Sequence, residues 1–166
     1  NNWNVSSVTN MMGIFEDSQF DQPLNDWDVS NVTNMNSMFR LSPFNQPLEK
    51  WHDKLGKVTN MSSLFQNSNF NNDISQWDVS NVTAMDDMFG GSPFNQDISG
   101  WDVSNVTLMR GMFYLNPNFN QDISGWDVSS VVGGAGINNG MYLMFKDATS
   151  FNQDLSSWCV TNITSK

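Results

Sequence analysis

The 166-residue chain carries 17 Asp and Glu against 7 Lys and Arg, which gives a formal net charge of −10. This charge excludes ordinary nucleic-acid binding, which needs clustered cations, and it argues against docking on an anionic membrane surface. An aromatic fraction of 13% excludes a disordered acidic tail. A single Cys and a single His exclude disulfide frameworks and Cys/His zinc sites. No stretch approaches the roughly 18 apolar residues of a membrane span, so membrane insertion is not expected.

A tandem repeat accounts for most of the composition. The seven Trp residues are spaced by 24, 24, 26, 24, 25 and 32 residues, and two columns of Phe recur in the same order between them. Such a period is typical of solenoids, in which each unit buries its apolar residues against its neighbours. The pattern is incomplete at both ends, and we expect the sequence to be a fragment of a longer protein.

The elements of each unit follow from the apolar spacing. Ile98, Trp101, Val103 and Val106 have the spacing of the strand half of a leucine-rich coil. A helical turn or two is then predicted at Met-x-x-Met-Phe, because these residues lie at i, i+3 and i+4. In the cleanest unit these residues are Met109, Met112 and Phe113, and along the chain the Met column recurs at 35, 38, 61, 85, 88, 109, 112, 141 and 144.

These elements predict an α/β solenoid, leucine-rich-repeat-like, with about seven coils, each with one short parallel β-strand and one short helix. It forms a single domain over residues 1–166, with a Gly-rich insertion at 133–140. Trp and Met, which recur at fixed offsets, are predicted to fill the core. The Asn that follows the second Phe is predicted to hydrogen-bond to backbone in a structural ladder.

The motif Phe-Asn-Gln-Asp-Ile-Ser-Gly-Trp-Asp-Val-Ser-Asn-Val-Thr at 94–107, followed by Met-x-x-Met-Phe, carries a resemblance. It resembles the approximately 25-residue repeat of bacterial surface proteins, known from mycoplasma-type lipoproteins and grouped with BspA-like leucine-rich repeats. The resemblance covers residues 3–165. It implies a leucine-rich-like solenoid on surface-exposed or secreted proteins, with adhesion as the usual suggestion, and it brings no catalytic residues.

Acidic side chains follow four of the Trp residues: Asp28, Asp78, Asp102 and Asp127. In register, neighbouring carboxylates would lie about 4.8 Å apart on the outward face of a sheet. Each exposed pair would then repel by about 1 kcal/mol. Backbone hydrogen bonds, a divalent cation or a basic partner are the three alternatives that would offset this repulsion. A second acidic column lies four residues before Trp.

Two departures from the repeat are candidate binding sites, because insertions on one face of a solenoid often bind ligands. The third unit is two residues longer and includes Lys54 and Lys57, which form a basic spot for an acidic partner or simply relieve repulsion. The insertion at 133–140 contains four Gly together with Asn138 and Asn139, and it does not have the sequence of a phosphate loop.

Together these features predict a non-catalytic, extracellular or cell-surface domain that mediates adhesion or protein or glycan recognition without a cofactor. A structural spacer or scaffold that associates end to end is the alternative. A calcium-binding or an ice-binding solenoid is a further alternative. His52 and Cys159 lie too far apart along the repeat to form a catalytic pair.

Overall fold

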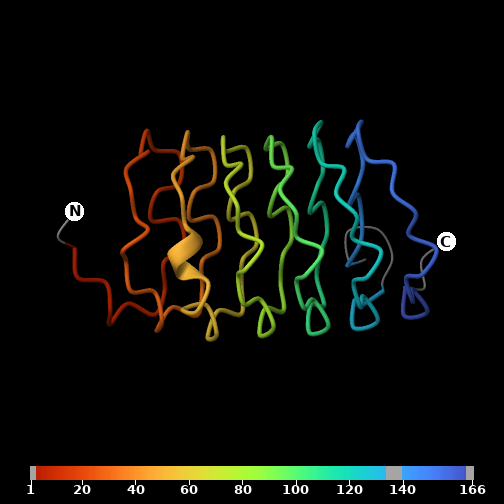
Figure 1. Cartoon of the computed structure of the whole chain (residues 1–166), viewed down its shortest axis with the longest axis horizontal. Coiled ribbons are helices and arrows are strands. Elements are labelled where there is room, and N and C mark those ends of the chain that lie inside the picture. The colour runs from red at the N-terminus through yellow and green to blue at the C-terminus, as the bar shows by residue number, and fades with distance from the viewer. Residues whose placement is uncertain (1–2, 134–139, 164–166) are drawn as a thin grey trace.

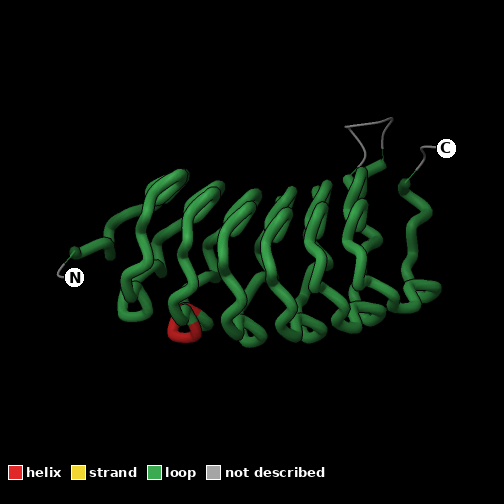
Figure 2. The backbone as a smooth tube through the Cα atoms, turned by 90° about the horizontal axis from the view of Figure 1, so that it is seen from above, coloured by secondary structure: helices red, strands yellow, loops and turns green. Residues whose placement is uncertain are grey.

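The chain folds as a row of stacked coils. The computed structural model describes residues 3–133 and 140–163. Successive coils follow one another along the long axis of the molecule, and the two termini lie at opposite ends (Figure 1). Seen from above, the coils repeat one outline, with tight loops along one side (Figure 2). The tandem repeat of the sequence is therefore a tandem repeat of the structure.

The predicted strands and helices are absent from residues 3–133 and 140–163, so the prediction of an α/β, leucine-rich-repeat-like solenoid is wrong. Across the described residues, the helical element is η1, a 3₁₀ helix at Glu49–Trp51. Pairing of the β type is limited there to isolated parallel bridges, with one residue from each of five coils: Asn10, Asn34, Asn60, Ala84 and Leu108. Turns, bends and irregular segments make up the remaining described backbone.

The segment predicted as a helix alternates between two kinds of hydrogen bond. The N–H groups of Met85, Asp87 and Phe89 donate to carbonyl groups of the next coil at 2.6–2.9 Å. The N–H groups between them, of Met88 and Gly90, donate three residues back at 3.3 and 3.0 Å. Met85, Met88 and Phe89 are all buried. The apolar residues whose spacing predicts one face of a helix are therefore buried by a series of turns instead.

This alternation places two left-handed residues in every one of six coils, at the second and sixth positions after the first repeated Met. Their φ angles lie between 51° and 64°. The first column contains Gly13, Ser37, Ser63, Asp87, Gly111 and Leu143, and the second contains Asp17, Leu41, Asn67, Gly91, Leu115 and Asp147. A left-handed conformation costs about 1–2 kcal/mol for a residue with a side chain. Hydrogen bonding between coils therefore imposes the conformation and prevents a continuous helix.

The segment predicted as a strand is also a pair of turns. The N–H of Trp101 donates to Ile98 O at 3.1 Å, and that of Val106 donates to Val103 O at 2.9 Å. Thr107 then donates its N–H to the preceding coil, to Thr83 O, at 2.9 Å. Because Trp101 and Val106 donate their N–H groups within local turns, no ladder of strand length forms here.

The core is a continuous stack of aromatic rings. Within each coil the two Phe rings are stacked with centroids 3.8–4.1 Å apart, and the first Phe lies 5.6–6.0 Å from its equivalent in the next coil. The Trp residues from Trp27 to Trp126 are at most 5% exposed, and the Met pairs of the inner coils are fully buried. The prediction that the Trp and Met columns form the core is confirmed for these coils. At the N-terminal end, Trp3 is 61% exposed.

Candidate functional site

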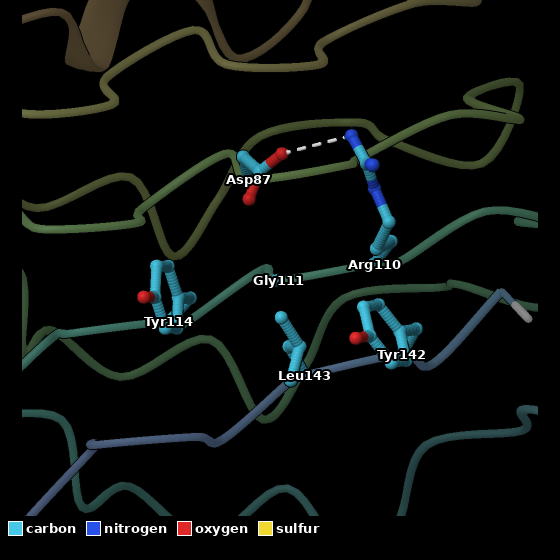
Figure 3. A pocket seen from close by; sticks show the side chains of 6 residues that line it. All are labelled: Asp87, Arg110, Gly111, Tyr114, Tyr142 and Leu143. Carbon is cyan, nitrogen blue, oxygen red and sulfur yellow. Dashed lines mark hydrogen bonds and ion pairs between the residues drawn. The ribbon is translucent and has the colours of Figure 1, made fainter. Parts of the chain in front are cut away.

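A pocket of about 130 Å³ interrupts the regular surface near the C-terminal end of the stack. Three consecutive coils line it with Asp87, with Arg110, Gly111 and Tyr114, and with Tyr142 and Leu143 (Figure 3). All six residues belong to the turn segments that follow Met85, Met109 and Met141. The first and second positions after Met hold small polar residues in the two preceding coils, namely Asn36, Ser37, Ser62 and Ser63.

A glycine creates the hollow. Gly111 occupies the first left-handed column, between Asp87 of the coil before and Leu143 of the coil after. A Cβ atom at Gly111 would meet Asp87 Oδ1 well inside van der Waals contact, and it would also lie 3.5 Å from the Cβ of Tyr114. Because Gly111 has no side chain, the Asp87 carboxylate lies over its backbone and the larger neighbours form the walls.

An ion pair crosses the pocket. Arg110 Nη2 donates to Asp87 Oδ2 at 3.3 Å, and the Arg110 backbone N–H donates to Asp86 Oδ1 at 2.9 Å (Figure 3). Burial raises the pKa of both Asp86 and Asp87 above the ordinary value of 3.8, although Arg110 opposes the shift. Asp86, Asp87 and Arg110 therefore carry a formal charge of −1 together on a strongly acidic molecule, because two partly desolvated carboxylates face one guanidinium group.

Two aromatic side chains flank this pair. Tyr114 and Tyr142 are the two tyrosines of the chain. Tyr142 is 37% exposed, and Lys146 Nζ lies 5.9 Å from the centroid of the Tyr114 ring. In Figure 3 the Tyr142 and Leu143 side chains project toward the Gly111 segment, and Tyr114 lies at its other end. Apolar ring faces and the polar pair thus share one small opening.

The predicted acidic column forms local turns. The four side chains Asp28, Asp78, Asp102 and Asp127 are exposed, and each accepts the backbone N–H of the Ser two residues on, at 3.0–3.1 Å. In two of them the Ser Oγ also donates, at 2.6 Å. Hydrogen bonds from Ser104 and Ser129 lower the pKa values of Asp102 and Asp127. Backbone hydrogen bonds, one of the three alternatives that would offset repulsion between these carboxylates, are therefore present in the structure.

The second acidic column has the same geometry, because Asp73, Asp97, Asp122 and Asp154 each accept the N–H of the Ser two residues on at 2.8–3.0 Å. No group of three or more His, Cys, Asp or Glu within residues 3–133 and 140–163 is arranged to hold a metal ion. His52 Nδ1 lies 2.9 Å from Glu49 O, and Cys159 is exposed. Neither residue lies in the pocket.

The Asn column forms the predicted structural ladder. Asn71 Oδ1 accepts the Asn95 N–H at 2.9 Å and Gln96 Nε2 at 3.0 Å, and the equivalent bonds recur from coil to coil. A further amide, Asn105 Nδ2, donates to Ser80 O of the preceding coil at 2.8 Å. These side-chain amides hydrogen-bond neighbouring coils to each other, so their role is structural.

The predicted basic residues contact the preceding coil. Lys54 Nζ donates to Trp27 O at 3.3 Å, and Lys57 Nζ donates to Asn31 Oδ1 at 2.7 Å. Both Lys residues lie in the longer third unit, and neither lines the pocket. Asn138 and Asn139 lie outside the described residues. The described end of the insertion is fixed, because Gly140 donates to Val132 O at 2.9 Å.

One family model matches the whole chain. Three overlapping segments, residues 1–55, 53–138 and 92–166, match the family described as Mycoplasma protein of unknown function, DUF285. The chain belongs to this family. The resemblance to a mycoplasma-type repeat is therefore confirmed. The grouping with BspA-like leucine-rich repeats is not supported, since the described coils of this DUF285 chain lack the strands and helices of that fold. No curated protein and no solved structure matches the chain.

Sequence reasoning missed the pocket in this DUF285 chain, although a signal was present. Tyr114 and Tyr142 occupy different offsets from their Met residues, so they do not form a column, and the distance between them in sequence hides their proximity. A tyrosine count of two in a chain with 12 Phe and 7 Trp was the available signal. Within the described part of the chain, no helix is long and apolar enough to cross a membrane.

Proposed function

We propose that this domain is a non-catalytic recognition module of a cell-surface or secreted protein, and that it binds its ligand at the pocket between Asp87 and Tyr142. The supporting observation is the contrast between this pocket and the rest of the stack. Elsewhere the polar side chains described above bond to neighbouring coils or close local turns. At the pocket, Arg110 and two Tyr residues leave hydrogen-bonding and apolar surface open to a ligand.

The arrangement favours binding over catalysis. The pKa values of Asp86 and Asp87 are raised, but Arg110 contacts both residues, so neither carboxylate is held as an isolated acid. The opening combines aromatic walls with a few fixed polar groups, which is the usual composition of a ligand site. Adhesion is the activity that such a module would support on a cell surface.

Binding to intact cells tests this proposal. Fluorescently labelled protein is added to cultured epithelial cells, and bound fluorescence is measured by flow cytometry over a concentration series. We expect saturable binding that the R110Q and Y142A variants each weaken by at least about tenfold. Absence of saturable binding, or full binding by both variants, would contradict the proposal.

Arg40 provides a matched control. Its Nη1 donates to Glu16 Oε1 of the preceding coil at 2.6 Å, and its Nε donates to Gln66 Oε1 of the next coil at 2.9 Å. Like Arg110, it lies on a Met-containing turn segment and pairs with a carboxylate one coil back. The R40Q variant removes the same charge outside the pocket lining. Because Arg40 acts on Asp87 only through its charge, R40Q should change cell binding by less than about twofold.

End-to-end association is a second candidate, favoured by one specific observation. Trp27 is 5% exposed, yet its Nε1 has no hydrogen-bond partner within residues 3–133 and 140–163. In the later coils this group donates to a Leu or Ile carbonyl of the preceding coil. Exposed Trp3, Met12 and Ile14 accompany the unpaired donor at the same end of the stack. A further coil of the same repeat would provide the acceptor and cover these side chains, whether it precedes Trp3 in the same chain or belongs to a second copy, and the second source is the one that association in solution tests.

Sedimentation velocity over a wide concentration range tests this association. We expect larger species at high concentration, and fewer of them for the W27F variant, which lacks the unpaired donor. The R110Q variant should associate like the unchanged protein, because Arg110 lies in a coil that is bonded to a neighbouring coil on both sides and is not part of an end face. A single monomeric species at all concentrations would contradict this candidate.

A further inference from the structure

We propose that the pocket binds one neutral sugar unit of a glycan. This inference rests on the proposed recognition function and specifies its ligand class. It follows from the walls, the polar groups, the local charge and the size of the pocket.

The walls suit the apolar face of a pyranose ring. Tyr114 and Tyr142 lie at opposite ends of the opening, and Leu143 lies between them (Figure 3). Aromatic rings are large and rigid, and each Tyr also carries a hydroxyl group that donates and accepts hydrogen bonds. A sugar presents the same combination, because its C–H groups form apolar patches beside hydroxyl groups.

The polar groups suit vicinal hydroxyls. Arg110 is held by one contact to Asp87 at 3.3 Å, which leaves most of its five N–H donors available. The Asp87 carboxylate has further acceptor capacity, and its side chain is 19% exposed, against 42% for Arg110. A hydroxyl donates to one group and accepts from the other. A paired carboxylate and guanidinium therefore match two adjacent hydroxyls.

The electrostatics disfavour an anionic ligand. The formal charge of the chain is −10, and Asp86 and Asp87 outnumber the single guanidinium group of Arg110. An anionic ligand would meet this negative field, and a cationic ligand would have to compete with Arg110 for the Asp87 carboxylate. A neutral polyol needs neither charge and uses both groups as hydrogen-bond partners.

The size limits the contact to one unit. The volume of about 130 Å³ is well below the 300–1,000 Å³ typical of sites for drug-sized ligands. One sugar ring enters, and the rest of the glycan stays in solvent. We therefore expect dissociation constants of about 1 mM for single sugars.

Direct titration tests the ligand class. Isotope-labelled protein is titrated with the methyl glycosides of mannose, glucose, galactose and N-acetylglucosamine, and with methyl sialoside as an anionic probe. The expected result is a saturable NMR shift of the Gly111 amide and of neighbouring pocket amides with at least one neutral sugar. R110Q and Y142A should weaken binding at least tenfold, whereas R40Q should not change it. No saturable shift with any neutral sugar, tighter binding of the sialoside, or full binding by both pocket variants would overturn the inference.

The variants need a folding control, and the two proposals need separate readouts. Matching melting temperatures and matching amide spectra outside the pocket confirm that R110Q and Y142A fold. Sialic acid is first removed from the cells with sialidase, and periodate is then used under conditions that cleave the vicinal ring diols of the neutral sugars on their glycans. Lost binding to treated cells supports the sugar ligand, and retained binding overturns it while leaving the recognition function intact. Saturable sugar shifts without cell binding support the sugar site and contradict cell-surface recognition.

Discussion

At the scale of the residue, the Trp side chains from Trp51 to Trp126 each have two tasks. The ring is buried in the core, and its Nε1 donates at 3.1–3.2 Å to the carbonyl of a Leu or Ile in the preceding coil. Phe would fill the same volume but has no donor. The indole group therefore sets the register between neighbouring coils, which explains why Trp recurs at this position.

The unpaired indole of Trp27 provides a comparison within the same column. Trp77 Nε1 donates to Leu48 O at 3.2 Å, whereas Trp27 Nε1 has no partner in the described part of the chain. W77F should therefore lower the free energy of unfolding by about 1 kcal/mol more than W27F, since only Trp77 loses a hydrogen bond. Urea unfolding followed by circular dichroism measures the difference. Equal losses of unfolding free energy in the two variants would show that the bond from Trp77 Nε1 to Leu48 O does not contribute to stability.

The Asp102 and Ser104 pair makes a prediction about pH. Hydrogen bonds from Ser104 Oγ and N–H hold the pKa of Asp102 below 3.8. Because the pKa is lower in the folded state, this contribution to stability is present above the unfolded value and is lost as pH falls through the folded pKa.

The S104A variant should raise the pKa of Asp102 toward its ordinary value without restoring it fully, because the backbone bond at 3.1 Å remains. Carbon-detected NMR titration of the carboxyl group measures the shift. Asp122 provides the control, since it bonds to Ser124 instead and its pKa should stay unchanged. If the pKa of Asp102 is the same in S104A as in the unchanged protein, Ser104 Oγ is not the main cause of the lowered pKa.

At the scale of the element, the turn segment is distinguished by its left-handed columns. A Gly or an Asn adopts positive φ at low cost, and Gly91 and Asn67 occupy the second column. Leu41 and Leu115 occupy the same column with φ of 57° and 56°. Leu is a poor choice for this conformation, so the bonds between coils stabilise these positions against local preference.

Replacing an exposed Leu in this column should stabilise the protein. Leu115 is 48% exposed, and L115N should raise the free energy of unfolding by about 0.5–1 kcal/mol through reduced backbone strain. Leu108, 37% exposed, is a bridge residue outside the left-handed columns. L108N should therefore give no such gain. The denaturant midpoints of the two variants measure the change in stability. A stability gain in both variants, or in neither, would contradict backbone strain at Leu115.

At the scale of the whole molecule, the described coils bond to their neighbours through repeated rows of backbone bonds, ring stacking and amide ladders. A stack of this kind loses structure most readily at its ends, where a coil has one neighbour instead of two. Trp3 and Trp158 belong to end coils, and Trp3 is 61% exposed. Trp77 and Trp101 lie in the middle, are at most 4% exposed, and donate to neighbouring carbonyls.

Hydrogen exchange of the seven indole N–H groups should show that local stability falls from the middle of the stack to its ends. We expect Trp77 and Trp101 to exchange slowest, Trp158 faster and Trp3 fastest. Two-dimensional NMR spectra recorded at intervals after transfer to deuterated solvent give the rates. Similar rates for Trp77 and Trp158 would indicate that the stack opens as one cooperative unit.

The sequence by itself determined the period, the core columns and the structural role of the Asn ladder, because stacking forces buried and bonded side chains to recur at fixed offsets. It did not determine the backbone conformation. The spacing of Met85, Met88 and Phe89 is the same for a helix as for alternating turns, and bonds between coils, which no single unit contains, decide between them. The pocket also depended on the tertiary structure, since Asp87, Gly111 and Tyr142 lie far apart in sequence and meet only when three coils are stacked.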